Sequence, residues 1–147
     1  MANVVILGIH KTCLDYDPYL RLAKKYTSSL KNDVVISFDL RLKTIYGYHS
    51  YNFETKTHKI QIGPKTCGSK NDKEVQIYSY IATTIHELKH AMQQEKLGAA
   101  FESKKYSKNK DIKDNSMSEF YSVLEIEARI FEEQNLSAAV KFYNTPR

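Results

Sequence analysis

The sequence predicts one α+β domain, in which a small antiparallel sheet of about three strands packs against helices. Its 147 residues suit a single domain with one hydrophobic core. Short segments rich in β-forming residues lie between residues 34 and 62. Segments in which apolar residues recur with helical spacing lie before and after them.

Composition and charge are those of an ordinary globular protein, with 11 Tyr and no Trp. The net charge of +5 would permit weak attraction to nucleic acid or acidic partners, although a solvated basic surface is the simpler interpretation. Cys13 and Cys67 are far apart in the sequence, which favours reduced thiols in an intracellular protein. We find no signal peptide and no apolar stretch long enough to cross a membrane. The expected location is therefore cytoplasmic.

The first third of the chain predicts a strand or ordered arm, followed by an amphipathic helix. Val4–Leu7 is a short apolar run. Asp17 and Pro18 are typical of a helix start, with Asp as the N-cap and Pro at the first helical position. Apolar residues then follow helical spacing, so residues 18–30 are expected to cover a sheet.

Three short strands are expected next. Residues 34–38 alternate between apolar and other side chains, residues 43–53 are rich in aromatic β-formers, and residues 58–62 place Ile60 and Ile62 on one face. Because the three segments follow one another closely, they predict an antiparallel meander.

A long helix is expected from about Glu74 to Leu97, and it contains the sequence His86-Glu87-Leu88-Lys89-His90. Two histidines four residues apart lie on one helical face, so their ring nitrogens can reach one metal ion. Glu87 lies close enough to act on a metal-bound water without being a ligand. The motif therefore predicts the parts of a zinc hydrolase site.

The predicted helix separates the histidines from its apolar stripe. At 100° per residue, Ile81, Ile85 and Leu88 fall on one side, and His86 and His90 fall on nearly the opposite side among small and polar residues. This favours the floor of a cleft over a position in the core. A pair of surface histidines on a charged helix remains the alternative. The presence of a third ligand would distinguish a metal site from such a pair.

The third ligand is expected on a helix over residues 117–134, which follows a capping box at Ser116–Glu119. Glu127 falls near the centre of its apolar face, whereas Glu125 falls on the polar side. A carboxylate on an apolar face is costly unless a cation or metal pairs with it. Glu127 is therefore predicted to complete a two-His, one-Glu site with water in the fourth position. A buried salt bridge, for example to Arg129, is the alternative.

A basic segment over residues 104–113 joins the two long helices. A solvated loop is the simpler interpretation of such a run. Contact with phosphates and a role as a lid over the site are the alternatives.

The sequence His86-Glu87-x-x-His90, followed by Glu125-Ile126-Glu127-Ala128-Arg129-Ile130-Phe131, resembles the zincin metallopeptidases with a glutamate third ligand. It is similar to small ImmA/IrrE-type peptidases and to compact metallopeptidases of phages and mobile elements. The resemblance covers mainly residues 75–133. It implies a minimal zincin-like domain over residues 1–147, in which strand 58–62 is the edge that pairs with an extended peptide. It also implies that His86, His90 and Glu127 bind Zn²⁺ and that Glu87 is the general base.

These features predict a zinc-dependent metallopeptidase that cleaves a protein or peptide substrate with a metal-activated water. The residue that would stabilise the oxyanion is left open among Tyr106, Tyr121, His49 and His58. Two other classes also fit the sequence. One is a catalytically idle zincin-fold binding or regulatory module, and the other is a nucleic-acid-associated metallopeptidase. Neither the substrate nor the oligomeric state follows from the sequence.

Overall fold

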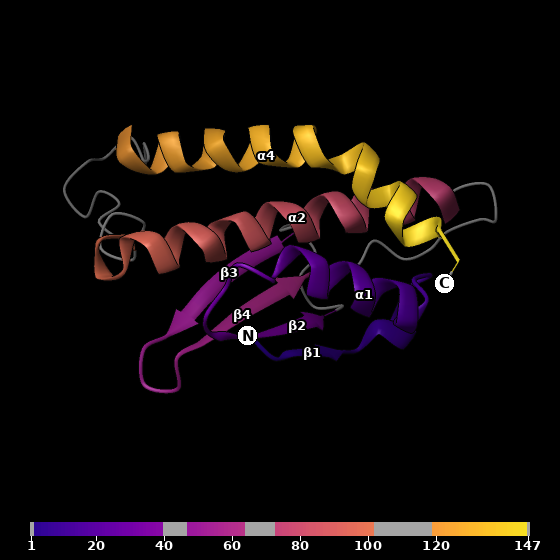
Figure 1. Cartoon of the computed structure of the whole chain (residues 1–147), viewed down its shortest axis with the longest axis horizontal. Helices are drawn as coiled ribbons and strands as arrows, with labels where there is room; N and C mark the ends of the chain where they lie inside the picture. Colours follow the sequence, from indigo (N-terminus) through magenta and orange to yellow (C-terminus); the bar gives the residue numbers. More distant parts are fainter. Residues whose placement is uncertain (1, 40–46, 64–72, 102–118, 147) are drawn as a thin grey trace.

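The computed structural model describes residues 2–39, 47–63, 73–101 and 119–146, which form a four-stranded sheet with helices on one of its faces (Figure 1). This arrangement agrees with the predicted α+β class. The described elements are, in chain order, β1 (Val4–Leu7), the 3₁₀ helix η1 (Ile9–Lys11), α1 (Tyr16–Tyr26), β2 (Asp33–Phe38), β3 (Gly47–Asn52), β4 (Thr57–Ile62), α2 (Lys73–Leu97) and α4 (Glu119–Asn144).

The sheet differs from the expected antiparallel meander. Its strand order is β1-β2-β4-β3, in which β1 and β4 both run parallel to β2 while β3 is antiparallel to β4. Strand β4 is thus inside the sheet, and the prediction that residues 58–62 form an edge is wrong. The inward side chains of β4 are at most 1 % exposed, which suits an interior strand, whereas β3 contains Gly47, Ser50 and Asn52 and pairs with β4 alone among the described strands.

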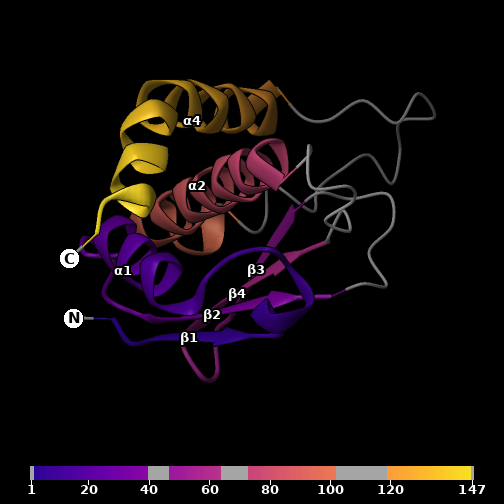
Figure 2. The ribbon, with the colours of Figure 1, turned by 90° about the vertical axis from the view of Figure 1, so that its right-hand side faces the viewer.

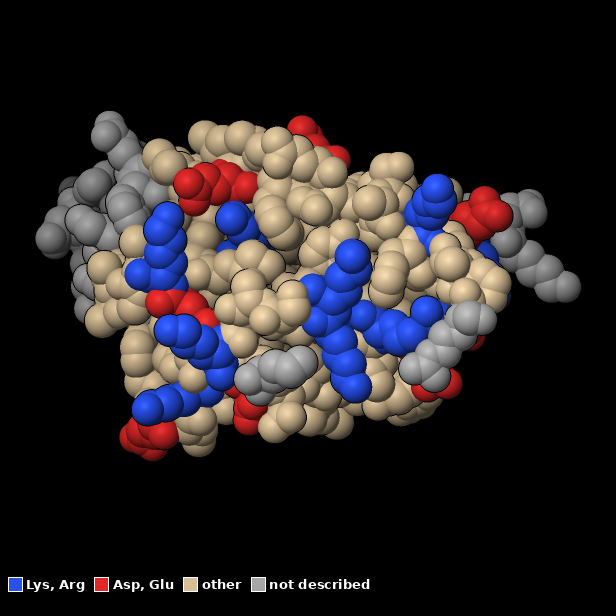
Figure 3. Space-filling model, in the orientation of Figure 1, with Lys and Arg blue, Asp and Glu red and all other residues tan. Residues whose placement is uncertain are grey.

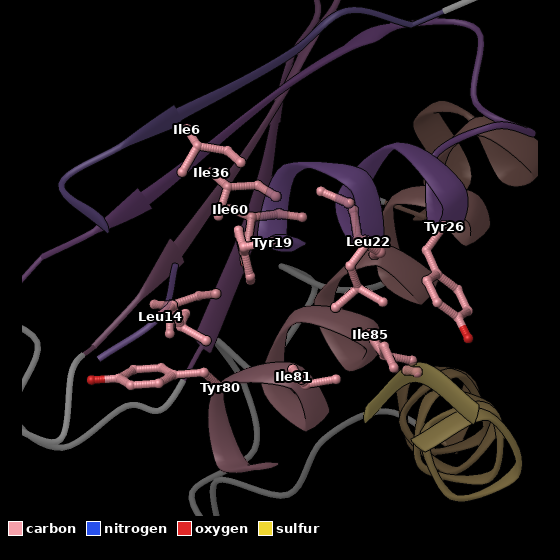
Figure 4. Close-up of a cluster of buried hydrophobic side chains, with 14 of the residues drawn as sticks. Ile6, Leu14, Tyr19, Leu22, Tyr26, Ile36, Ile60, Tyr80, Ile81 and Ile85 are labelled. Atoms are coloured by element: carbon pink, nitrogen blue, oxygen red, sulfur yellow. The ribbon is translucent and has the colours of Figure 1, made fainter. Parts of the chain in front are cut away.

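One face of the sheet carries the hydrophobic core. Ile6, Ile36 and Ile60 are in register on β1, β2 and β4, and His49 of β3 extends the same row. Figure 4 shows the three isoleucines one after another, with labelled side chains of α1 beside them and of α2 beneath them in this view. The alternation predicted for residues 34–38 and 58–62 is confirmed, since Val34, Ile36 and Phe38 and also Ile60 and Ile62 are buried.

Helix α1 covers this face, as predicted, but begins two residues earlier and ends four residues earlier than expected. Asp15 rather than Asp17 occupies the N-cap position. The Tyr19 hydroxyl lies 2.6 Å from Thr84 Oγ1 of α2, and Thr84 Oγ1 donates to the Tyr80 carbonyl at 2.7 Å. Because the single Thr84 hydroxyl proton is used there, Tyr19 is the donor to Thr84. This bond joins α1 and α2 inside the core.

Helix α2 lies between the sheet and α4, so that the molecule has three layers in the view of Figure 2. The predicted end of the helix is confirmed. Gly98 follows Leu97 with φ +60°, and its amide donates to the Gln94 carbonyl at 2.7 Å. A positive φ is the conformation in which glycine ends a helix at little cost. As a middle layer, α2 is buried on two sides, and its histidine face is covered by α4.

Helix α4 runs antiparallel to α2 (Figure 1) and continues to Asn144, ten residues beyond the expected end at residue 134. Its buried side matches the predicted apolar face only in part. Val123, Ile126 and Ile130 are about half exposed, whereas Leu124 and Ala128 are buried and Phe131 is partly buried against the core. The buried apolar residues of α4 are Leu124, Ala128, Leu136, Ala139 and Tyr143.

The state of the cysteines differs from the expectation. Cys13 is disulfide-bonded, which corrects the prediction of reduced thiols. The one other cysteine, Cys67, lies outside the described residues, as do segment 104–113 and Ser116 of the expected capping box. A disulfide is more common in oxidising compartments, so it gives no support to a cytoplasmic location.

The described helices include none with the length and apolar character needed to cross a bilayer. On the face drawn in Figure 3, lysine and arginine side chains are spread over the surface, and acidic side chains lie between several of them. On this face the charge is that of a solvated, mixed surface rather than a patch of one sign.

Candidate metal centre

His86 and His90 are on the side of α2 that faces α4. Their positions one helical turn apart bring the two rings edge to face, with centroids 4.9 Å apart. His90 is 4 % exposed and His86 is partly exposed. The sequence-derived prediction that these residues avoid the core stripe is correct, because Ile81, Ile85 and Leu88 belong to the hydrophobic core cluster and the two histidines do not.

The carboxylate that reaches both histidines is Glu125. Its Oε1 lies 2.5 Å from His86 Nε2, and its Oε2 lies 3.2 Å from His90 Nε2. The three side chains offer ligand atoms that all lie within 4.8 Å of one another, and they form a group that could hold a metal ion. Two imidazoles and one carboxylate are a typical donor set for a catalytic zinc ion with an open fourth position.

Glu127, the third ligand expected from the sequence, is not brought to the histidines. It is exposed, and its Oε1 accepts a hydrogen bond from Gln93 Nε2 at 3.0 Å. The physical reason is the rotation of α4 about its axis. The packed side of α4 includes the buried residues Leu124 and Ala128 and extends to Glu125, whereas Ile126, Glu127 and Ile130 are exposed. Counting apolar residues alone wrongly placed Glu127 at the centre of the packed side.

All four ring nitrogens of the histidine pair lie against acceptor oxygens. In His86, Nδ1 is 3.1 Å from Glu132 Oε1 and Nε2 is beside Glu125. In His90, Nδ1 is 2.8 Å from Gln93 Oε1 and Nε2 is also beside Glu125. A neutral imidazole has one N–H and one lone pair, so it can satisfy only one of its two acceptors.

A metal ion would satisfy this arrangement. Nδ1 of each ring would keep its proton for its own acceptor, and each Nε2 lone pair would be available to an ion held together with Glu125. Hydrogen bonds from Nδ1 to carboxylate or amide oxygens are the usual way in which proteins orient histidine ligands. The residues present therefore fit a metal ion.

The electrostatics of the described residues favour positive charge at this position. Burial acts to lower the pKa of His86, but the hydrogen bond to Glu125 and the charges of Glu87, Glu125 and Glu132 outweigh it and raise this pKa. Hydrogen bonds from His86 and His90 hold the pKa of the Glu125 carboxyl far below its usual range, although its partial burial acts in the opposite direction. These interactions therefore favour an ionised Glu125 that faces a cation.

A cavity of about 480 Å³ opens beside His86 and Glu125, and its wall is formed by β3, α2 and α4. Glu87, which is 7 % exposed, lines it together with Gly47, His86 and Glu125. The backbone of Gly47 approaches Glu87 so closely that a Cβ at this position would lie 2.9 Å from Glu87 Cγ and 3.0 Å from Glu87 Oε2. The glycine at the start of β3 therefore leaves room for the Glu87 carboxylate at the cavity wall.

Gln93 and Glu132 are site residues that sequence reasoning missed. They lie three residues after His90 and seven residues after Glu125, so they share the helical faces of those residues. A search for acceptors at helical spacing from the motif would have found both. Their partners on the opposite helix follow from the packing of α4 on α2.

His49 and His58 belong to another buried cluster. His49 Nε2 is 3.0 Å from His58 Nδ1, and His58 Nε2 is 2.8 Å from Glu95 Oε2. Neither histidine lines the cavity beside Glu87, so neither is placed to stabilise an oxyanion there. Of the other two candidates, Tyr106 and the side chain of Tyr121 lie outside the described part of the chain.

Comparisons of this chain with protein-family models, curated proteins and solved structures give no match.

Proposed function

We propose that this protein is a zinc-dependent metallopeptidase with a minimal zincin-like domain, and that it cleaves peptide bonds of a protein substrate. One observation carries the proposal. Both imidazoles of a His-Glu-x-x-His sequence have Nδ1 against an acceptor and Nε2 directed at one carboxylate. The zinc ligands in this proposal are His86, His90 and Glu125, with Glu125 in place of Glu127.

The cavity supports a catalytic rather than a purely structural metal. Structural zinc sites are closed by four protein ligands, whereas catalytic sites keep a position open for water or substrate. Here two of the three candidate ligands, His86 and Glu125, line a cavity of about 480 Å³. A bound zinc ion supplies Lewis acidity and lowers the pKa of its water toward neutrality.

Glu87 has the role of general base in this proposal. Its carboxylate lines the same cavity as His86 and Glu125. A carboxylate oxygen of Glu87 accepts a proton from the attacking water and then delivers it to the leaving amine nitrogen, so that no net proton is left on the enzyme. Near burial excludes much of the competing solvent around it.

The substrate is proposed to bind as an extended strand along β3. This strand pairs on one side with β4 and has no second partner among the described strands, and its first residue, Gly47, lies at the cavity wall. The N–H and C=O groups of such an edge can pair with an extended peptide. The proposed edge is thus β3 rather than residues 58–62.

The test is hydrolysis by zinc-loaded protein of a mixture of unstructured peptides, with the products identified by mass spectrometry. Glu87→Gln should retain zinc, because Glu87 is not a ligand, and should lose roughly 10²–10⁴-fold in cleavage rate. Glu74→Gln, an exposed position in the first turn of α2, is the matched control and should cleave like the wild type.

Two outcomes would count against the proposal. Undiminished cleavage by folded, zinc-loaded Glu87→Gln would exclude Glu87 as the base. Zinc binding by the wild type without cleavage of any peptide would favour a catalytically idle zincin-fold module.

A further inference from the structure

Gln93 connects the two helices of the candidate metal centre. It lies one turn after His90 on α2, and it is 5 % exposed. Its side-chain amide makes three hydrogen bonds, one within α2 and two to α4. A buried amide that satisfies both ends of its side chain is expected to be held in one orientation.

The partners of Gln93 determine which way its amide points. Its Nε2 donates to the Leu124 carbonyl at 2.9 Å and to Glu127 Oε1 at 3.0 Å, and both of these atoms are acceptors only. The oxygen of the amide must therefore face His90, whose Nδ1 is 2.8 Å away. An oxygen in this place requires a proton on His90 Nδ1, so Nε2, which faces Glu125, is the nitrogen that would bind a metal.

The amide nitrogen of Gln93 holds the α4 backbone next to the third candidate ligand, Glu125. Leu124 directly precedes Glu125, so a bond to the Leu124 carbonyl fixes the turn of α4 from which Glu125 projects. One side chain thus sets the tautomer of a histidine ligand on α2 and the position of a carboxylate ligand on α4.

We propose that Gln93 is a positioning residue that couples metal binding to the docking of α4 on α2, and that Glu127 is its outer partner rather than a ligand. The inference rests on the metal site of the proposed function, but it does not depend on peptide cleavage. Metal affinity falls when the amide is lost, because His90 loses its tautomer control and Glu125 loses its anchor. For the same reason, the metal stabilises the folded chain less.

The test compares Gln93→Leu with Gln94→Leu. Both glutamines are buried on α2, but the Gln94 amide has no hydrogen bond to a residue of the site. Zinc affinity is measured by competition with a chromophoric chelator, and Tm is measured with and without zinc. Gln93→Leu should bind zinc about 10- to 100-fold more weakly, which is typical of the loss of a partner that orients a ligand. Its zinc-dependent rise in Tm should fall below half of the wild-type rise.

A pair of variants separates positioning from packing. Gln93→Glu keeps the size and the acceptor for His90 Nδ1, but it places a carboxylate against the Leu124 carbonyl and Glu127. It should weaken zinc binding. Adding Glu127→Gln supplies a donor opposite that carboxylate, so the double variant should recover part of the affinity. In the zinc-free wild type, ¹⁵N NMR should show His90 protonated at Nδ1, and this signature should be lost in Gln93→Leu.

The results that would overturn the inference differ from those that would overturn the proposed function. Equal zinc affinity in Gln93→Leu, Gln94→Leu and the wild type would exclude the coupling, whatever the protein cleaves. A lack of recovery in the Gln93→Glu, Glu127→Gln double variant would exclude Glu127 as the outer partner. A wild type that binds zinc with the predicted Gln93 dependence but hydrolyses no peptide would leave the coupling intact and remove the peptidase.

Discussion

Glu125 is the carboxylate that contacts both motif histidines within the described residues, and Glu127, two positions later, contacts Gln93 instead. Two residues along a helix correspond to a rotation of about 200°, so the two carboxylates project in different directions, and Glu125 alone of the two reaches the histidines. At the scale of single residues, the ligand set thus depends on the side of α4 that packs.

Alanine substitutions of the two glutamates test this ligand set. We expect Glu125→Ala to weaken zinc binding by more than about 100-fold, because it removes a charged ligand and leaves two ring nitrogens without their shared partner. Glu127→Ala should weaken it by less than about tenfold, because it removes only one of two acceptors of the Gln93 amide. Chelator competition gives both values. The reverse order would restore Glu127 as the ligand.

Gly47 is predicted to be intolerant of any side chain. A Cβ there would lie 2.5 Å from Thr83 Cγ2 and 2.9 Å from Glu87 Cγ, so Gly47→Ala should destabilise the protein by about 1–3 kcal/mol and displace Glu87. Peptide cleavage should fall more than zinc affinity, because the three ligands are untouched. Urea unfolding and the two site assays measure these effects.

Gly98→Ala is the matched glycine control for that experiment. Its cost arises from the backbone, since φ is +60° and, apart from its chain neighbours, no atom of the described residues lies within 4 Å of the added Cβ. We expect roughly 1–2 kcal/mol of destabilisation with unchanged zinc affinity. Loss of zinc affinity in both glycine variants to the same extent would show that the Gly47 effect is general unfolding.

At the scale of elements, α2 is the central helix of the described structure. It packs on β3, β4, α1 and α4, and its two opposite sides serve the core and the metal centre. Helix α4 contributes Glu125 and Glu132 from positions two turns apart on its packed side. The metal centre is therefore an interface between helices, and its geometry requires α4 to be docked.

The hydrogen bond between Tyr19 and Thr84 is expected to stabilise the contact of α1 with α2. Tyr19→Phe keeps the ring in the core and leaves the Thr84 bond to the Tyr80 carbonyl intact. It should therefore lower the free energy of unfolding by about 1 kcal/mol, the usual contribution of a buried hydrogen bond. Urea unfolding of zinc-free protein measures this. A loss of more than about 3 kcal/mol would mean that the ring itself had moved.

At the scale of the whole molecule, a second buried cluster joins the sheet to α2 and to the start of β2. Glu95 of α2 accepts hydrogen bonds from the Lys31 and Asn32 amides at 2.8 and 3.0 Å, and it contacts His58 of β4. His58 in turn contacts His49 of β3. Three segments distant in the sequence are thus connected through Glu95.

This cluster predicts that stability decreases in acid. Burial acts to raise the pKa of Glu95, but the Lys31 amide, His58 and the Asn32 amide outweigh it and lower this pKa. The pKa of His58 is lowered chiefly by burial, against the effect of Glu95. Below its ordinary pKa of 6.5, His58 takes up protons more readily in the unfolded chain, and below 4.5 Glu95 does the same. Both groups therefore remove stability as the pH falls.

The measurement is urea unfolding of zinc-free protein at pH 7, 5 and 3.5. We expect the free energy of unfolding to fall at each step. Between pH 5 and 3.5 the fall should be smaller in Glu95→Gln than in the wild type, because the variant has no carboxylate to protonate at this position. An equal fall in both proteins would show that Glu95 has the same pKa in the folded and unfolded states.

The features that could be predicted from the sequence are those with strong local signals. The sequence predicted the α+β class, the extent of α2 with its stop at Gly98, the inward faces of β2 and β4, and the separation of His86 and His90 from the core stripe. These features depend on helical and strand periodicity or on a glycine at positive φ, and such signals lie within a few residues.

The strand order and the residues that contact the histidines depend on the tertiary structure and could not be predicted from the sequence. The tertiary structure put β4 between β2 and β3, selected Glu125 instead of Glu127, and brought Gln93 and Glu132 to the histidines. Strand order and the rotation of a helix about its axis depend on contacts between distant segments. The side of α4 that packs combines Glu125 with Leu124, Ala128 and the partly buried Phe131, while Val123, Ile126 and Ile130 stay about half exposed.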